Sequence, residues 1–138
     1  DEDPGPLLKA VCLYQEVEEM EQGMDTVVGN GGIRLSGGQA KRLALARTLC
    51  HKRPVLVLDD PFSALDKETE KQVFASLKKL AADRIVILLS HRLYLFPQMD
   101  QVIFMEKGRV ITGSHESVMK ECPEYRRLYE GQEGGADR

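Results

Sequence analysis

Residues Val55–Asp66 read VLVLDDPFSALD, in which four apolar residues run directly into the carboxylates of Asp59 and Asp60. A strand without polar alternation is typical of a parallel sheet that is buried on both faces. Two adjacent acids at the end of such a strand repel each other unless a positive partner relieves them. In open α/β sheets, ligands bind beyond the carboxyl ends of the strands. The stretch therefore predicts a layered α/β domain with a site for a hard cation, such as Mg²⁺, and a phosphate.

The sequence on either side of this strand supports the same class of fold. We expect a second buried strand over Arg84–Leu89, ending at Ser90-His91-Arg92. Because neighbouring parallel strands end at the same edge of a sheet, His91 is expected near the two acids. The other expected elements are an amphipathic helix over Leu7–Met20, helices from Ser36 to about His51 and from Lys67 to about Ala82, a hairpin of Gln101–Met105 and Arg109–Thr112 around Lys107-Gly108, and short helices at Ser117–Glu121 and Glu124–Glu130.

The first of these helices carries a run of acidic residues. Its apolar positions recur every three or four residues, which predicts one buried stripe. The acids between them are interpreted as a solvated face, the usual role of such charge runs. They are Glu16, Glu18, Glu19 and Glu21.

Composition excludes several classes of protein. With 42% hydrophobic and 30% charged residues, the 138-residue chain is an ordinary globular sequence. A net charge of −3 provides no global basic field for nucleic acid. The three cysteines are far apart and form no CxxC pair, which disfavours a disulfide framework or a zinc site. Because the chain starts at Asp1 without a methionine, we expect it to be a piece of a longer protein.

Residues Leu35–Gln39 read LSGGQ at the expected start of a helix. Glycines there leave backbone N–H groups uncovered, and the helix dipole adds partial positive charge, which favours an anion such as phosphate. Ser36 adds a hydroxyl donor and is also a typical N-cap residue. On its own the pattern fits a plain helix start about equally well, so both interpretations stay open.

Four motifs occur in close order, and together they resemble the nucleotide-binding domain of the ATP-binding cassette (ABC) family. LSGGQ at 35–39 resembles the family signature, VLVLDD at 55–60 the Walker B strand, SALD at 63–66 the D-loop, and His91 the switch histidine. The resemblance runs from about Leu7 to about Glu130. It implies an α/β fold, a partial P-loop NTPase-like domain with parallel core strands, flanking helices and a helical signature subdomain. Residues 1–50 would be part of the signature subdomain, 51–130 the later half of the ATPase core, and 131–138 a flexible tail.

The resemblance also implies a mechanism with ATP and Mg²⁺ as cofactors. Two nucleotide-binding domains of this family face each other head to tail and close around two ATP molecules, so the signature of one domain serves the ATP of the other. The residues of this chain that would serve the partner's ATP are Leu35, Ser36, Gly37, Gly38 and Gln39. In the chain's own site, Asp59 would hold Mg²⁺, Asp60 would orient the attacking water, His91 would contact the γ-phosphate, and Asp66 would couple the two sites.

The sequence departs from the family pattern at two places. Position 60 is usually glutamate, and the shorter Asp60 withdraws its carboxylate by roughly 1 Å, a misplacement that can cost ~10²-fold in rate. We therefore expect a degenerate own site, paired with a competent site on another chain, as in heterodimeric exporters. A Walker A motif, GxxxxGK[ST], is absent because no glycine is followed by lysine, and the Q-loop is not visible either. Both are expected upstream of Asp1, so this chain alone should bind ATP poorly and hydrolyse none.

Finer features favour the exporter branch of the family. Thr26–Gly29 resembles the loop by which exporter domains touch the membrane helices, and His91-Arg92-Leu93 is also similar to exporters. The implied protein couples ATP binding and hydrolysis to export, with a transmembrane domain as partner, at the cytoplasmic face of the cell membrane. Two alternatives stay open: a DNA-repair or chromosome-structure ATPase, which would carry a long coiled coil, and a non-catalytic fragment of the fold.

Each single residue also has a plainer interpretation. Asp59 could cap a helix, Asp60-Pro61 could form a turn, and Asp66 could be the N-cap of the helix that follows. His91 alone would more often be a structural histidine. The occurrence of four motifs in family order favours the functional interpretation.

Overall fold

The computed structural model describes residues 3–133, and the chain forms two compact units, the first ending at Leu89 and the second beginning at Ser90. The division into a signature subdomain and an ATPase core near residue 50 stays a prediction. Of the expected tail, residues 131–133 continue the last helix and 134–138 lie outside the described residues.

Unit 1 opens with two short helices where one was predicted. They are α1 (Gly5–Ala10) and α2 (Tyr14–Glu18). The chain turns between them at Cys12, whose φ of +55° is incompatible with a continuous right-handed helix. The prediction of one helix was wrong because the apolar spacing continues across the turn, where Val11 and Leu13 are both buried. A 3-10 turn, η1 (Gly23–Asp25), follows α2.

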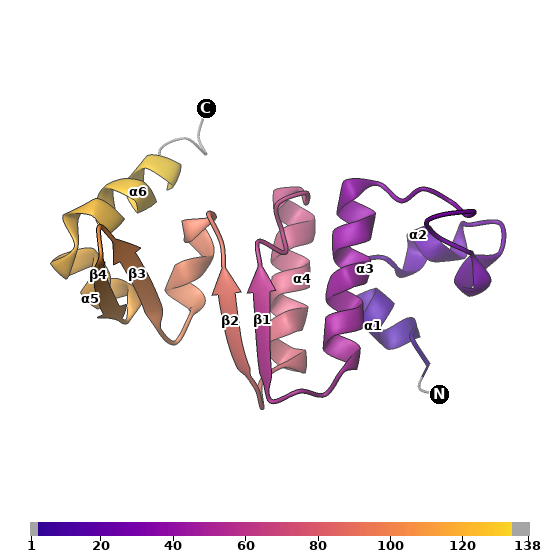
Figure 1. Cartoon of the computed structure of the whole chain (residues 1–138), viewed down its shortest axis with the longest axis horizontal. Coiled ribbons are helices and arrows are strands. Elements are labelled where there is room, and N and C mark those ends of the chain that lie inside the picture. Colours follow the sequence, from indigo (N-terminus) through magenta and orange to yellow (C-terminus); the bar gives the residue numbers. More distant parts are fainter. Residues whose placement is uncertain (1–2, 134–138) are drawn as a thin grey trace. The chain divides into compact units, whose positions relative to one another are not determined.

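Two longer helices begin where the sequence predicted. Helix α3 (Gly37–Cys50) has Ser36 as its N-cap, and α4 (Lys67–Leu80) has Asp66. Helix α1 contacts both, and Figure 1 shows it beside α3. Their buried residues supply much of the core of unit 1, namely Leu45, Ala46 and Leu49 from α3 and Val73, Phe74 and Leu77 from α4.

The strands β1 (Val55–Asp59) and β2 (Ile85–Leu89) pair in parallel, which confirms their predicted neighbourhood (Figure 1). The expected burial on both faces was wrong. Leu56 is 3% exposed, whereas Val57 is 61% exposed. Side chains alternate between the two faces of a strand, and the described residues cover only one face of this sheet. The register places Asp59 opposite Leu89 at the carboxyl end.

Unit 2 begins with the 3-10 segment η2 (Leu93–Gln98), followed by the antiparallel hairpin of β3 (Val102–Glu106) and β4 (Arg109–Gly113). This confirms the predicted hairpin: its turn residues Lys107 and Gly108 both have positive φ, as a tight right-twisted hairpin requires. The helices α5 (His115–Glu121) and α6 (Pro123–Glu133) complete the unit. The buried core of unit 2 consists of Leu93, Val102, Val118, Cys122 and Tyr125. Within residues 3–133 no helix has both the length and the apolar character needed to cross a bilayer.

Candidate functional site

The segment Asp59–Asp66, here called the acid loop, leaves the carboxyl end of β1 with a constrained backbone. Asp60 has a φ of +45°, a left-handed conformation that few residues other than glycine adopt. Its N–H donates to the carbonyl oxygen of Leu89 at 2.7 Å, and its own carbonyl oxygen accepts from Nζ of Lys41 at 3.1 Å. Asp59 is exposed beside it. The backbone of Asp60 is therefore held from both sides, while the Asp59 carboxylate faces solvent.

Lys41 connects the acid loop to α3, a role that the sequence analysis missed. Its Nζ also donates to the hydroxyl of Ser63. One turn earlier in α3, Gly38 lies against the same loop, since a Cβ there would be 3.0 Å from the carbonyl oxygen of Ala64. Residues three apart share a helix face, so the position of Lys41 after the signature was an available signal. The start of α3 and the acid loop thus form one packed arrangement.

The signature residues form a capping box at the start of α3, which confirms Ser36 as its N-cap. The N–H of Gln39 donates to Oγ of Ser36 at 3.2 Å, and the N–H of Ser36 donates to Oε1 of Gln39 at 2.8 Å. Because Oγ of Ser36 acts as the acceptor here, its hydroxyl proton is available to another group. The first i→i−4 hydrogen bond joins Ala40 to Ser36, so the N–H groups of Gly37 and Gly38 precede it. These donors, at a helix N-terminus, suit an anion.

Glu16 of α2 is bonded to α3, which corrects its interpretation as part of a solvated face. Its Oε2 accepts from Nε2 of Gln39 at 2.7 Å, and its Oε1 pairs with Nη1 of Arg42 at 2.6 Å. Arg42 also donates to the carbonyl oxygens of Gly38, at 3.3 Å, and of Cys12. Partial burial raises the pKa of Glu16, but the hydrogen bonds from Arg42 and Gln39 and the charge of Arg42 outweigh it, so the net pKa is lowered.

Asp66 caps α4, as its plainer interpretation predicted. Its Oδ1 accepts from the N–H groups of Glu68 at 3.1 Å and Thr69 at 2.9 Å, and its Oδ2 accepts from the Thr69 hydroxyl at 2.7 Å. The backbone hydrogen bond from Thr69, followed by its hydroxyl, lowers the pKa of Asp66. The expected role of Asp66 in coupling two sites stays a prediction.

His91 belongs to unit 2 and lies in the turn that precedes η2, with an exposed side chain. Its carbonyl oxygen accepts from Nε2 of Gln132 in α6 at 2.6 Å, and Oε1 of Gln132 accepts from the N–H of Leu93 at 2.9 Å. These bonds fix the backbone on both sides of Arg92. The expected approach of the imidazole to the two acids stays a prediction.

The end of β1 offers the exposed carboxylate of Asp59 as a ligand for Mg²⁺. Across residues 3–133 no cluster of three or more His, Cys, Asp or Glu side chains has a metal-binding arrangement. Mg²⁺ in phosphate sites is usually held by one or two carboxylates, with waters and phosphate oxygens completing the coordination. The exposed carboxylate of Asp59 fits that pattern.

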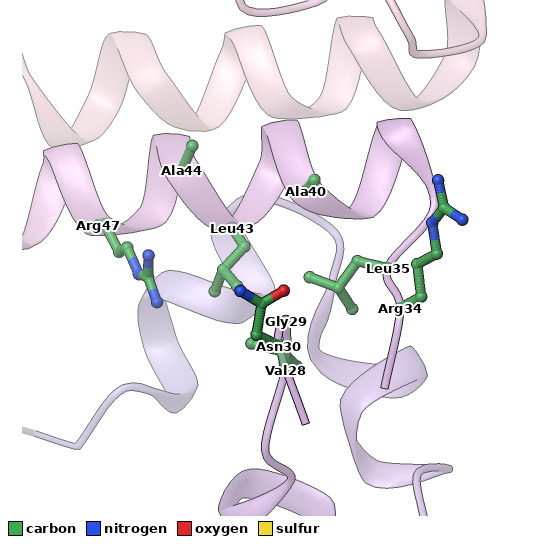
Figure 2. A pocket seen from close by; sticks show the side chains of 9 residues that line it. All are labelled: Val28, Gly29, Asn30, Arg34, Leu35, Ala40, Leu43, Ala44 and Arg47. Carbon is green, nitrogen blue, oxygen red and sulfur yellow. The ribbon is translucent and has the colours of Figure 1, made fainter. Parts of the chain in front are cut away.

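A hollow of about 630 Å³ lies on another side of α3. Figure 2 shows Leu35 and Leu43 extending toward the loop of Val28 to Asn30, with Arg34 and Arg47 at the two ends of the hollow. Its floor is apolar and its ends are positively charged. It includes the end of the predicted membrane-contact loop, Thr26–Gly29.

The sequence of the chain is similar to that of known proteins. The sequence profile of the family described as ABC transporter matches residues 11–63. The ATP-dependent lipid A-core flippase of Haemophilus ducreyi is 41% identical over 88% of this chain and 21% of its own length. The flippase of Mannheimia succiniciproducens is 40% identical over 92% of this chain and 22% of its own length.

A solved structure has a similar fold. The chain resembles a bacterial Atm1-family ABC exporter with ATP bound, with a TM-score of 0.83 and 31% identity over 94% of this chain and 23% of the other. These matches support the interpretation of the chain as part of an ABC transporter nucleotide-binding domain, of the exporter-like kind. It spans about a fifth of the length of the curated relatives that it matches.

Proposed function

We propose that this chain is the signature-bearing part of an ATP-hydrolysing subunit that couples ATP binding and hydrolysis to export across a membrane. The observation that carries the proposal is the start of α3, where a capping box fixes Ser36 and leaves its hydroxyl proton and the N–H groups of Gly37 and Gly38 available. The matches to two flippases and to an exporter support transport over the DNA-repair alternative.

In this proposal the signature binds the terminal phosphate of an ATP molecule held by a second nucleotide-binding domain. The hydroxyl of Ser36 and the N–H groups of the two glycines donate to phosphate oxygens, and the N-terminal dipole of α3 strengthens this binding. Leu35 precedes this helix and lines the hollow beside it. The partner domain is either a second copy or a related chain.

The chain's own site uses the end of β1. Asp59 would hold Mg²⁺, which neutralises phosphate charge when bound. Asp60 orients a water molecule, but its side chain is one methylene shorter than that of glutamate. Its constrained backbone cannot move toward the water to make up the difference. His91 supplies a donor to the phosphate, and Asp66 lies where the acid loop would face the second domain. We therefore propose a degenerate own site and a competent site built with this chain's signature.

The hollow beside α3 is the proposed contact with the transmembrane domain. Its apolar floor and its two arginines suit a short helix with an apolar face and acidic ends. In this proposal the chain works at the cytoplasmic face of the membrane. The second alternative, a non-catalytic fragment, would retain the fold without hydrolysis by the full-length protein.

The test is ATP hydrolysis by the full-length protein together with its second nucleotide-binding domain in a membrane. We expect Mg²⁺-dependent hydrolysis, and we expect Asp60→Glu to increase turnover at this chain's own site by up to ~10²-fold because the carboxylate regains its reach. Asp59→Asn is the matched variant and should lose Mg²⁺-dependent binding at that site. Unchanged turnover in Asp60→Glu would contradict the degenerate site, and absence of hydrolysis in the wild type would contradict the whole proposal.

A further inference from the structure

We infer that Glu16 is a positioning residue for the signature: its carboxylate fixes the Gln39 amide, and through it the hydroxyl of Ser36, in the orientation that binds phosphate. This inference rests on the proposed function of the signature. Glu16 is not assigned a phosphate contact of its own. It acts from α2, 23 residues away in sequence, on the first turn of α3.

Both ends of the Gln39 amide are fixed. Oε1 accepts from the N–H of Ser36 at 2.8 Å, and Nε2 donates to Oε2 of Glu16 at 2.7 Å. A reversed amide would set its NH₂ group against the N–H of Ser36 and its oxygen against the Glu16 carboxylate. Both contacts would be repulsive, so the Glu16 carboxylate and the N–H of Ser36 together determine which way the amide points.

Gln39 in turn holds Ser36, whose hydroxyl is the proposed phosphate donor. The N–H and the side chain of Gln39 hold Ser36 from two directions, and Oγ of Ser36 is the acceptor of the first of these bonds at 3.2 Å. Its proton is therefore available to a group outside the helix. Since the oxygen and one N–H of the Gln39 amide are occupied within the chain, we assign Gln39 to holding Ser36 rather than to touching the nucleotide.

Position 16 needs a carboxylate because both of its neighbours there are donors. Its two oxygens accept from different donors, Gln39 on one side and Arg42 at 2.6 Å on the other. Arg42 is itself held by the carbonyl oxygens of Gly38 and Cys12, so it anchors Glu16 in turn. An amide at position 16 would present its NH₂ group to one of these two donors.

The test is steady-state ATP hydrolysis by the full-length protein paired with its second domain. Glu16→Gln is expected to lower kcat about tenfold, with a smaller change in KM, because a shifted Ser36 loses contact mainly when the two domains close. Glu18→Gln is the matched control: it neutralises an exposed acid on the same helix and should leave both constants unchanged. Thermal unfolding of each variant shows whether the fold is retained.

A swap separates the positioning role from a purely structural one. Glu16→Gln combined with Gln39→Glu reverses the donor and acceptor while keeping a carboxylate at the third helical position, which still suits a capping box. We expect the double variant to recover most of the rate lost by either single variant. If Glu16 served only as the ion-pair partner of Arg42, the swap would recover nothing, since Arg42 would still face an amide.

Each outcome decides between the two proposals. A wild type without hydrolysis overturns the proposed function. A wild type that hydrolyses ATP, with Glu16→Gln behaving like Glu18→Gln, overturns the positioning role alone. If Glu16→Gln does not fold, Gln39→Glu and the swap decide: a loss in the single variant that the swap repairs supports the inference, and a loss that persists overturns it.

Discussion

Asp60 combines a strained backbone with an acidic side chain. Aspartate and asparagine are the residues that most readily accept a left-handed conformation after glycine, and Asp60 has a φ of +45°. Two anchors hold it there, the carbonyl oxygen of Leu89 and Nζ of Lys41. Strain of this kind persists where surrounding structure fixes it, and it occurs most often at functional sites. The left-handed turn at position 60 therefore suits aspartate better than most other residues.

The two signature glycines provide a matched test of steric fit. A Cβ on Gly38 would be 3.0 Å from the carbonyl oxygen of Ala64, whereas one on Gly37 would be 3.9 Å from Cβ of Ala64. Alanine favours a helix over glycine by up to about 1 kcal/mol. We expect Gly37→Ala to raise the free energy of unfolding by up to that amount. We expect Gly38→Ala to lower it by about 1 kcal/mol, because the acid loop must shift.

Denaturant unfolding of the chain, followed by circular dichroism, measures both changes. Equal effects of the two substitutions would show that Gly38 is not constrained by the acid loop.

Residues that act locally were predictable from the sequence, and residues that act at a distance were not. The caps formed by Ser36 and Asp66 depend on neighbours three positions away, so a short window contains the whole signal. Lys41 and Glu16 meet partners 19 and 23 residues away. For Glu16 the local pattern predicted the opposite, because a run of acidic residues normally forms a solvated face.

At the scale of elements, features set by local signals were again predicted well, and features set by distant contacts were not. The boundaries of α3 and α4 were predicted within two residues, because each has a strong N-cap. The break between α1 and α2 was missed because Cys12 has no turn-forming side chain, yet it adopts a φ of +55°. The parallel pairing of β1 with β2 followed from their apolar composition, whereas the exposure of one face depends on which elements cover the sheet.

In unit 2, a partly buried hydrogen bond between α5 and α6 makes stability depend on pH. The hydroxyl of Tyr125, a fully buried residue, lies 2.8 Å from Nδ1 of His115. Burial, with a smaller effect of Tyr129, raises the pKa of Tyr125 from 10.0 to about 12. The folded state therefore retains this proton more strongly than the unfolded state. Its contribution to stability is fully present below pH 10 and is lost as the pH rises through about 12.

We expect Tyr125→Phe to reduce the pH dependence of unfolding between pH 10 and 12 and to cost about 1 kcal/mol at neutral pH, where a hydrogen bond is lost. Denaturant titrations at several pH values, followed by circular dichroism, measure both effects. A variant as sensitive to base as the wild type would show that another group causes the loss.

At the scale of the whole molecule, the sheet of unit 1 has one apolar face that the described residues leave open. Five aliphatic side chains on it are between 45% and 63% exposed: Val55, Val57, Ile85, Ile87 and Leu89. A contiguous apolar surface of this kind is normally buried against another element or another chain. An uncovered strand edge adds unpaired backbone groups that favour pairing between molecules. The chain by itself should therefore associate.

Substituting one residue of this face tests that expectation. Val57→Lys places a charge at the centre of β1, on the exposed side, where it should reduce association without disturbing the buried Leu56 and Leu58. Val27→Lys is the matched control, since Val27 is 59% exposed and lies outside the sheet. Sedimentation velocity over a range of concentrations should show concentration-dependent association for the wild type and Val27→Lys, and a mainly monomeric Val57→Lys. Association that persists equally in all three proteins would place the contact elsewhere on the molecule.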